Sequence, residues 1–213
     1  MYIPAHFEAP RPEVLHGLIE RYPRGALVTN GPDGLDANHV PFEFDPARGP
    51  LGTLRAHVAR ANPVWREAAG NPDALVIFQG ATAYISPTWY PSKHETHRQV
   101  PTWNYMVVHA HGRIVVHDDE AFVRGLVARL TRKMEASEAK PWKMGDAPPD
   151  FIAQMVGAIV GIEIEVTKLT GKWKLGQNKE SADRVGAADA LRAHGSDAQR
   201  DVADAMLNAP PAI

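Results

Sequence analysis

The sequence has no cysteine among its 213 residues. This absence excludes disulfides, zinc–thiolate sites, iron–sulfur clusters and thiol nucleophiles. No apolar run approaches the roughly 18 residues needed to cross a bilayer, so we expect no membrane partner. The opening residues also lack the basic and apolar segments of a secretory signal. We therefore expect a soluble, cytoplasmic protein.

A surplus of cations is also missing. Lys and Arg number 23 against 25 Asp and Glu, so the formal net charge is -2. Non-specific nucleic-acid binding needs a cationic surplus, so the net charge does not support DNA binding. A local basic surface keeps DNA open as a partner, on a predicted helix with Arg124, Arg129, Arg132 and Lys133.

Sequence signatures of common catalytic sites are absent too. There is no Walker loop, no GxGxxG after a strand and no GxSxG elbow. The segment His94-Glu95-Thr96-His97 has one residue too few for the zincin pattern. We therefore predict no metal site and name no catalytic residue.

Short strand patterns separated by turns fill most of the chain. Alternating or continuous apolar residues predict strands at 26–29, 39–44, 53–58, 74–78, 82–86, 102–117 and 162–166. Apolar residues at helical spacing predict helices at 12–21, about 119–135, about 151–156 and in two segments of 181–207. Six or seven strands with helices mainly at the ends predict an α+β protein built round a closed or nearly closed antiparallel barrel. We expect one domain over 1–180 and a C-terminal helical extension over 181–213 packed on the same domain.

A cationic segment follows the strand at 53–58. Arg55 and His57 share one face of that strand, and Arg60 lies in the turn that follows. Asn62 suits a helix N-cap and Pro63 a first helical residue. Cations beside the free N–H groups of a helix start favour an anion such as phosphate. The alternative is an ordinary strand-to-helix turn with exposed arginines.

Aromatic and polar side chains gather in two further segments, 82–90 and 100–105. Flat aromatic surface edged by hydrogen-bonding groups suits a planar heterocycle, although aromatic residues on strands more often belong to the core. A third segment, 172–179, combines lysines with amides. It suits a phosphate or an electron-rich ring system, or is a solvated strand end.

Together these segments resemble the FMN-binding negative transcriptional regulator family of the PaiB type. The resemblance runs from the first residues to about residue 185. It is carried by five motifs in the same order: Tyr2-Ile3-Pro4-Ala5-His6-Phe7, Arg55-Ala56-His57-Val58-Ala59-Arg60-Ala61-Asn62-Pro63, Ala83-Tyr84-Ile85-Ser86-Pro87-Thr88-Trp89-Tyr90, Val100-Pro101-Thr102-Trp103-Asn104-Tyr105 and Lys172-Trp173-Lys174-Leu175-Gly176-Gln177-Asn178-Lys179. The last motif departs from the family's pattern, which has Ser at the position of Gly176 and Arg at that of Lys179.

The resemblance implies a split β-barrel related to pyridoxamine-phosphate oxidases and flavin reductases, with peripheral helices. It also implies a homodimer with FMN in clefts at the interface. Arg55, His57, Arg60 and Asn62 would lie near the FMN phosphate, and the strand His39-Val40-Pro41 would offer backbone groups to the ring edge. The remaining cofactor-binding residues implied are Thr102, Trp103, Asn104, Lys174, Gln177 and Asn178.

Three functions remain open at this point, beside the possibility of a barrel that has lost its ligand. The first is an FMN-binding regulator of transcription, acting directly or through a ligand. The second is a flavin-dependent oxidoreductase or flavin reductase that acts on a small molecule, in which the flavin carries the redox chemistry. The third is a haem-binding or haem-degrading protein, since related split barrels host haem and the chain has ten histidines.

Overall fold

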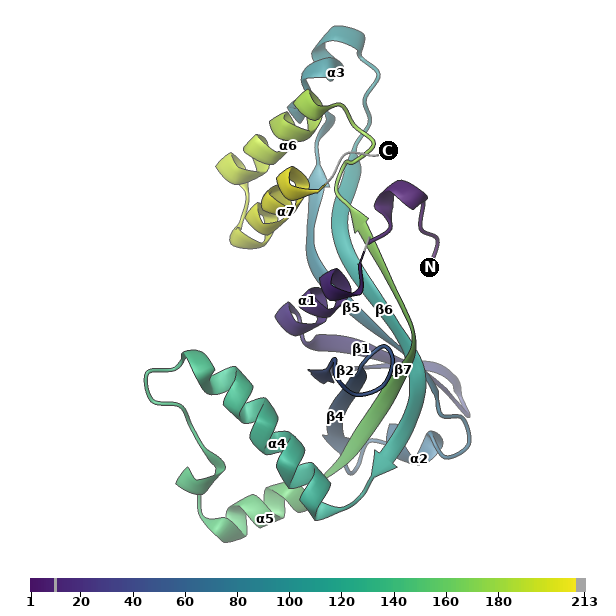
Figure 1. Cartoon of the computed structure of the whole chain (residues 1–213), viewed down its shortest axis with the longest axis vertical. Helices are drawn as coiled ribbons and strands as arrows, with labels where there is room; N and C mark the ends of the chain where they lie inside the picture. The colour runs from purple at the N-terminus through teal and green to yellow at the C-terminus, as the bar shows by residue number, and fades with distance from the viewer. Residues whose placement is uncertain (10, 210–213) are drawn as a thin grey trace. The chain divides into compact units, whose positions relative to one another are not determined.

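The computed structural model describes residues 1–9 and 11–209 (Figure 1). The chain divides into two compact units. Unit 1 comprises Met1–Leu18, Gln79–Val108 and Thr170–Ile213, and unit 2 comprises Ile19–Phe78 and His109–Leu169. No described helix combines the length and apolar composition that crossing a membrane requires. The domain boundary expected at residue 180 stays a prediction.

Seven strands form one sheet in the order β2-β1-β5-β6-β7-β4-β3. The pairs β1–β2, β1–β5, β3–β4 and β4–β7 are antiparallel. The strands are β1 (Arg24–Gly31), β2 (Gly34–Pro41), β3 (Glu43–Asp45), β4 (Thr53–Ala59), β5 (Asp73–Ile85), β6 (Thr102–His117) and β7 (Ile159–Lys174).

The edge strands of this sheet, β2 and β3, are separated by a single residue, Phe42. Since β2 pairs with β1 and β3 pairs with β4, the chain passes from one edge of the sheet to the other in one step. The sheet of unit 2 must therefore curl until its edges meet. Phe42 is 1% exposed and packs edge-on against Phe78, with ring centres 5.6 Å apart. The predicted antiparallel barrel is confirmed.

Three helices belong to unit 2: α2 (Val64–Glu67), α4 (Glu120–Met134) and α5 (Pro149–Gly157). Two 3-10 turns, η3 (Glu135–Ser137) and η4 (Met144–Asp146), lie between α4 and α5. Asp119 caps α4, because its Oδ1 accepts a hydrogen bond from the Phe122 N–H at 2.8 Å. Val123, Ile152 and Val156 form a small apolar cluster between α4 and α5.

Unit 1 holds the 3-10 turns η1 (Ala5–Phe7) and η2 (Pro87–Trp89) and the helices α3 (Pro91–Thr96), α6 (Ser181–His194) and α7 (Asp197–Asn208). Helix α1 (Pro12–Arg21) begins in unit 1 and its last residues belong to unit 2. Figure 1 shows α6 and α7 packed side by side. Their buried residues Leu191 and Met206 share one apolar core with Ala83 and Ile85 of β5.

Several predicted bounds need correction. Residues 74–78 and 82–85 belong to one strand, β5, because Gly80 continues the strand instead of ending it, and Ser86 lies just beyond its end. A Cβ at Gly80 would lie 3.0 Å from Leu18 Cδ1, so close packing explains this glycine. The segment 39–44 breaks at Phe42, and β7 is longer than residues 162–166. The helix predicted from Pro63 is a single turn, α2, too short to carry a substantial dipole.

The close approach of β6 and β7 gives a stability prediction. A Cβ built on Gly112 of β6 would lie 2.3 Å from the backbone oxygen of Glu165 in β7. Backbone cannot move aside as a flexible side chain can, so Gly112→Ala should lower the free energy of unfolding by about 1–3 kcal/mol. Urea unfolding followed by circular dichroism measures this change.

Gly17 of α1 provides the matched control, since a Cβ there meets nothing within 4 Å. Gly17→Ala should raise the free energy of unfolding by up to about 1 kcal/mol, because alanine favours a helix over glycine. Equal effects of the two substitutions would contradict the close packing of β6 on β7.

Candidate functional site

A pocket of about 240 Å³ lies in unit 1, where the start of β6 meets the end of β7. It brings together four of the predicted cofactor-binding residues, Thr102, Asn104, Lys174 and Asn178. The other lining residues are Phe7, Tyr90, Val100, Pro101, Gly176 and Lys179. Four separate stretches of sequence thus meet at one place, and their chemistry combines cations, amides and apolar surface.

Two lysines give the pocket its positive charge. Lys174 Nζ donates to the backbone oxygen of Trp103 at 2.6 Å and also contacts the hydroxyl of Thr102. Burial lowers the pKa of Lys174, and the nearby charges of Lys172 and Lys179 lower this pKa further. Within the described residues neither Lys174 nor Lys179 has a carboxylate partner. An anion in this pocket would therefore be attracted to both.

A buried network holds Lys179 in place. Lys179 Nζ donates to Gln99 Oε1 at 2.6 Å, and the Gln99 amide nitrogen donates to Asp183 Oδ2 at 2.9 Å. Asp183 also accepts from the backbone N–H and the hydroxyl of Ser92. Burial, helped by the charge of Asp183, raises the pKa of Tyr90 to about 12. The Tyr90 ring, 5.2 Å from Lys179 Nζ, therefore stays neutral and presents its face to the cation.

Asn104 is the most informative residue of the pocket. It is 1% exposed, and its Nδ2 has no hydrogen-bond partner among the described residues. A Cβ built on Gly176, at the pocket wall, would lie 3.8 Å from this nitrogen. A buried donor left without an acceptor costs about 1–3 kcal/mol. The unpaired Nδ2 in a cationic pocket thus indicates a ligand with an acceptor atom.

The side chain of Gln177 stabilises the turn that follows β7. Gly176 adopts φ +80°, a conformation that favours glycine, and its oxygen accepts from the Lys179 N–H at 2.9 Å. Gln177 Oε1 accepts from the Leu175 N–H at 2.8 Å, and its Nε2 donates to the Trp173 oxygen at 2.6 Å. Because both ends of the Gln177 amide bind backbone, this side chain shapes the turn. Its predicted contact with the cofactor remains a prediction.

The second predicted cluster lies in unit 2, and its arginines are engaged with carboxylates. Arg55 is 8% exposed, and its guanidinium donates to Glu163 Oε2 at 2.8 Å and to Asp45 Oδ2 at 3.2 Å. Arg60 donates to both carboxylate oxygens of Asp118, at 2.9 and 2.5 Å. An incoming phosphate would have to compete with these carboxylates. The predicted phosphate contacts of Arg55 and Arg60 remain predictions.

The other predicted residues of unit 2 have mixed roles. Asn62 Oδ1 accepts from the Val64 N–H at 3.0 Å, and Asn62 Nδ2 donates to Asn38 at 2.6 Å, so its amide joins the end of β4 to β2. Burial lowers the pKa of His57, whose Nδ1 has no partner among the described residues. His39, Val40 and Pro41 lie in β2, in register with Ala26, Gly25 and Arg24 of β1. The predicted roles of these residues in binding FMN stay predictions.

Sequence reasoning did not assign Phe7, Tyr90 or Lys179 to the site. Lys179 lies five residues after Lys174 in the same motif, and this shared motif was the signal that could have assigned Lys179 to the site. Phe7 and Tyr90 reach the pocket only through the tertiary fold, from η1 and from the junction of η2 with α3. Trp103 contributes its backbone oxygen to Lys174.

Comparison with known proteins gives a family match. A family model described as "Putative FMN-binding domain" matches residues 1–168. The protein named "Protease synthase and sporulation protein PAI 2" of Bacillus subtilis is 29% identical over 206 residues, which is 97% of this chain and 96% of that protein. An uncharacterized protein of Emericella nidulans, AN0679, is 30% identical over 239 residues, covering 96% of this chain and 95% of the relative.

Solved structures agree on the fold. The flavocytochrome Anf3 of Azotobacter vinelandii matches with a TM-score of 0.59 at 12% identity, over 78% of this chain and 69% of that one. The FAD and heme binding protein of Mycobacterium smegmatis matches with a TM-score of 0.53 at 15% identity, over 89% of this chain and 80% of that chain. At these identities the likeness concerns the fold alone, and it agrees with the split barrel. The chain therefore belongs to the FMN-binding, PaiB-type family of split-barrel proteins, with FMN as its cofactor.

Proposed function

We propose that this protein is a homodimeric FMN-binding regulator of transcription, and that the pocket of unit 1 receives an oxygen-bearing end of FMN. The unpaired Asn104 Nδ2 beside Lys174 and Lys179 is the observation that carries this proposal. FMN offers acceptor oxygens both on its phosphate and on its ring. The name of the Bacillus subtilis relative, which refers to protease synthesis and sporulation, supports a regulatory role. Once bound, FMN supplies the capacity for electron transfer.

The size of the pocket supports a dimer. Its volume of about 240 Å³ lies below the range of about 300–1,000 Å³ that is usual for whole small-molecule ligands. One chain's pocket therefore suits part of the cofactor, and the rest needs additional surface. Tyr84 and Trp103, which are 42% and 55% exposed, pack edge-on with ring centres 5.8 Å apart. Such an exposed aromatic pair is typical of surfaces that a partner covers.

The charges of α4 support regulation through a ligand or a partner protein more than through direct DNA contact. Arg124 is paired with Glu120 at 2.7 Å, and Arg129 with Glu43 at 2.6 Å. Two of the four basic residues predicted as a basic surface are thus neutralised. The remaining pair, Arg132 and Lys133, is a small footprint for phosphate contacts.

The proposed function can be tested with the purified protein. Bound FMN should give its absorbance bands and quenched fluorescence, and sedimentation should show a dimer. In cells, deletion of the gene should change transcription, while the pure protein should not shift duplex DNA even at low salt. A colourless protein that does not quench added FMN would overturn the proposal. Rapid anaerobic bleaching of the flavin by NADPH, with transcription unchanged by deletion, would instead assign an oxidoreductase.

Asn104 and Gln177 give a matched pair of variants, since both are buried amides close to the pocket. Asn104→Leu removes the unpaired donor, so it should weaken FMN binding by about tenfold or more without lowering the free energy of unfolding. Gln177→Leu leaves two backbone groups unpaired, so it should lower the free energy of unfolding by about 1–3 kcal/mol. Fluorescence titration and urea unfolding measure the two effects. If Asn104→Leu binds FMN normally, Asn104 does not contact the cofactor.

The lowered pKa of Lys174 gives a pH dependence. Because Lys174 loses its proton at a lower pH than an ordinary lysine, its attraction for an anion should fade as the pH rises towards the usual lysine range. Lys174→Arg keeps its charge throughout this range, so its FMN affinity should decline less. FMN ionises identically with both proteins, so the difference between the two profiles isolates residue 174. Superimposable profiles would remove Lys174 from the site.

A further inference from the structure

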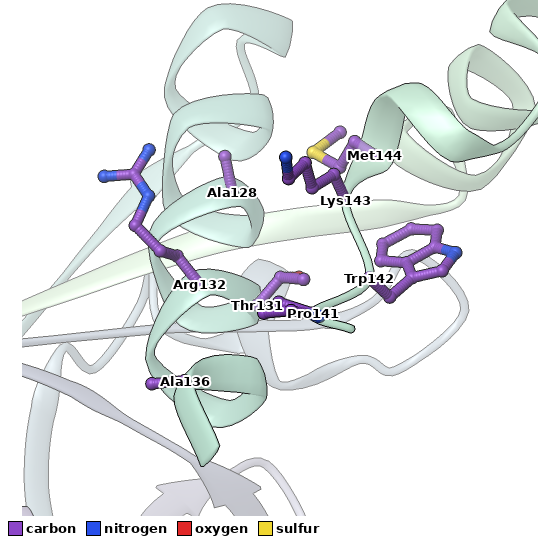
Figure 2. Close-up of a pocket in the computed structure, with 8 residues that line it drawn as sticks. All are labelled: Ala128, Thr131, Arg132, Ala136, Pro141, Trp142, Lys143 and Met144. Atoms are coloured by element: carbon purple, nitrogen blue, oxygen red, sulfur yellow. The ribbon is translucent and has the colours of Figure 1, made fainter. Parts of the chain in front are cut away.

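A second, larger cavity lies in unit 2, and none of the residues assigned above to FMN lines it. Its volume is about 520 Å³. Ala128, Thr131 and Arg132 of α4 form one wall, and Trp142, Lys143 and Met144 of the segment that leads to α5 form the opposite wall (Figure 2). In Figure 2 the side chain of Lys143 reaches from its segment towards the helix. The volume falls within the range of about 300–1,000 Å³ typical of small-molecule sites.

The wall opposite α4 is held by specific contacts. The backbone N–H of Trp142 donates to Glu135 Oε2 at 3.0 Å, and the backbone N–H of Lys143 donates to Asp146 Oδ2 at 2.9 Å. Met144 packs against the apolar cluster between α4 and α5. The segment is therefore anchored at three successive residues, so the cavity is a formed feature of unit 2.

The lining of this cavity is apolar apart from one hydroxyl and two cations. Ala128, Trp142 and Met144 provide apolar surface, and Thr131 provides the hydroxyl. Arg132 and Lys143 carry charge, no carboxylate lines the cavity, and neither cation has an ion-pair partner among the described residues. Arg124 and Arg129 of the same helix do have such partners. The cavity is thus complementary to a molecule with an apolar body and a negative group.

We infer that this cavity binds a small apolar carboxylate. Its hydrocarbon or aromatic body would lie against Trp142 and Met144. Its carboxylate would lie against Lys143, whose ammonium can donate to it, and Arg132, on the far side of Ala128 in Figure 2, would add a second positive charge at the cavity wall. The indole of Trp142, 42% exposed in this structure, would be covered by the ligand.

The same two cations argue against an apolar protein surface as the occupant. An apolar protein surface placed over the cavity would remove water from Arg132 and Lys143 without giving them a counter-charge, and this costs free energy. A small carboxylate supplies the counter-charge together with the apolar contact. This inference does not depend on the proposed function, because no residue of the cavity belongs to the FMN pocket.

Isothermal titration calorimetry of the full-length protein with 4-phenylbutyrate tests this inference. We expect one molecule to bind per chain, and 4-phenylbutanamide, which is uncharged, to bind about tenfold more weakly or worse. 4-Phenylbutylamine, which is cationic, should not bind. Absence of binding at millimolar carboxylate, or equal binding of the carboxylate and the amide, would overturn the inference.

Variants locate the site. Arg132→Gln and Lys143→Gln should each weaken binding of 4-phenylbutyrate about three- to tenfold, and Ala128→Phe should abolish it by filling the cavity. Lys140→Gln is the matched control, because Lys140 lies in the same segment but does not line the cavity. An unchanged thermal midpoint shows that each variant is folded.

If Lys140→Gln weakens binding as much as Lys143→Gln, the attraction is a general surface effect and the site assignment is wrong. Dimerisation that rises with protein concentration and prevents 4-phenylbutyrate from binding would also overturn the inference.

Discussion

The passage of the chain through Phe42 is the constraint on which the barrel depends. Because β2 and β3 occupy opposite edges of the sheet and one residue separates them, the sheet of unit 2 cannot remain open. Phe42 is buried in the barrel core. Two of the central strands, β6 and β7, are 16 residues long and contribute residues to both units. Their unit-1 ends carry the pocket, so the strands that complete the barrel also position Thr102, Asn104 and Lys174.

A carboxylate partner distinguishes the basic side chains with a structural role from those that are candidates for binding a ligand. Arg55 and Arg60 each have carboxylate partners, so their guanidinium groups join strands and turns of unit 2. Lys174 and Lys179 have oxygen partners but no carboxylate within the described residues. An unpaired cation keeps its electrostatic attraction available for a ligand, whereas a paired one must first give up its partner. By this criterion the pocket of unit 1 is better prepared for an anion than the cluster around Arg55.

The strand content could be predicted from the sequence for a physical reason, whereas the pocket residues of the last two motifs came from the family resemblance. Alternating apolar residues report burial of a strand face, and Asn104 follows this alternation as an inward polar residue of β6. The sequence could not show that Arg55 meets Glu163, because the two are 108 residues apart and only the β4–β7 register brings them together. Local motifs therefore named candidate donors but could not show the partners that engage them.

The pocket of unit 1 is a strained electrostatic arrangement. It holds a buried donor without an acceptor, a lysine whose pKa is lowered by burial, and a second lysine that repels the first. Each of these features disfavours the folded chain, and a single anionic acceptor relieves all of them. A ligand that binds only the folded state stabilises it in proportion to the logarithm of its concentration. Occupancy by FMN and stability of the fold should therefore rise together, and the proposed regulator would by this means respond to cofactor supply.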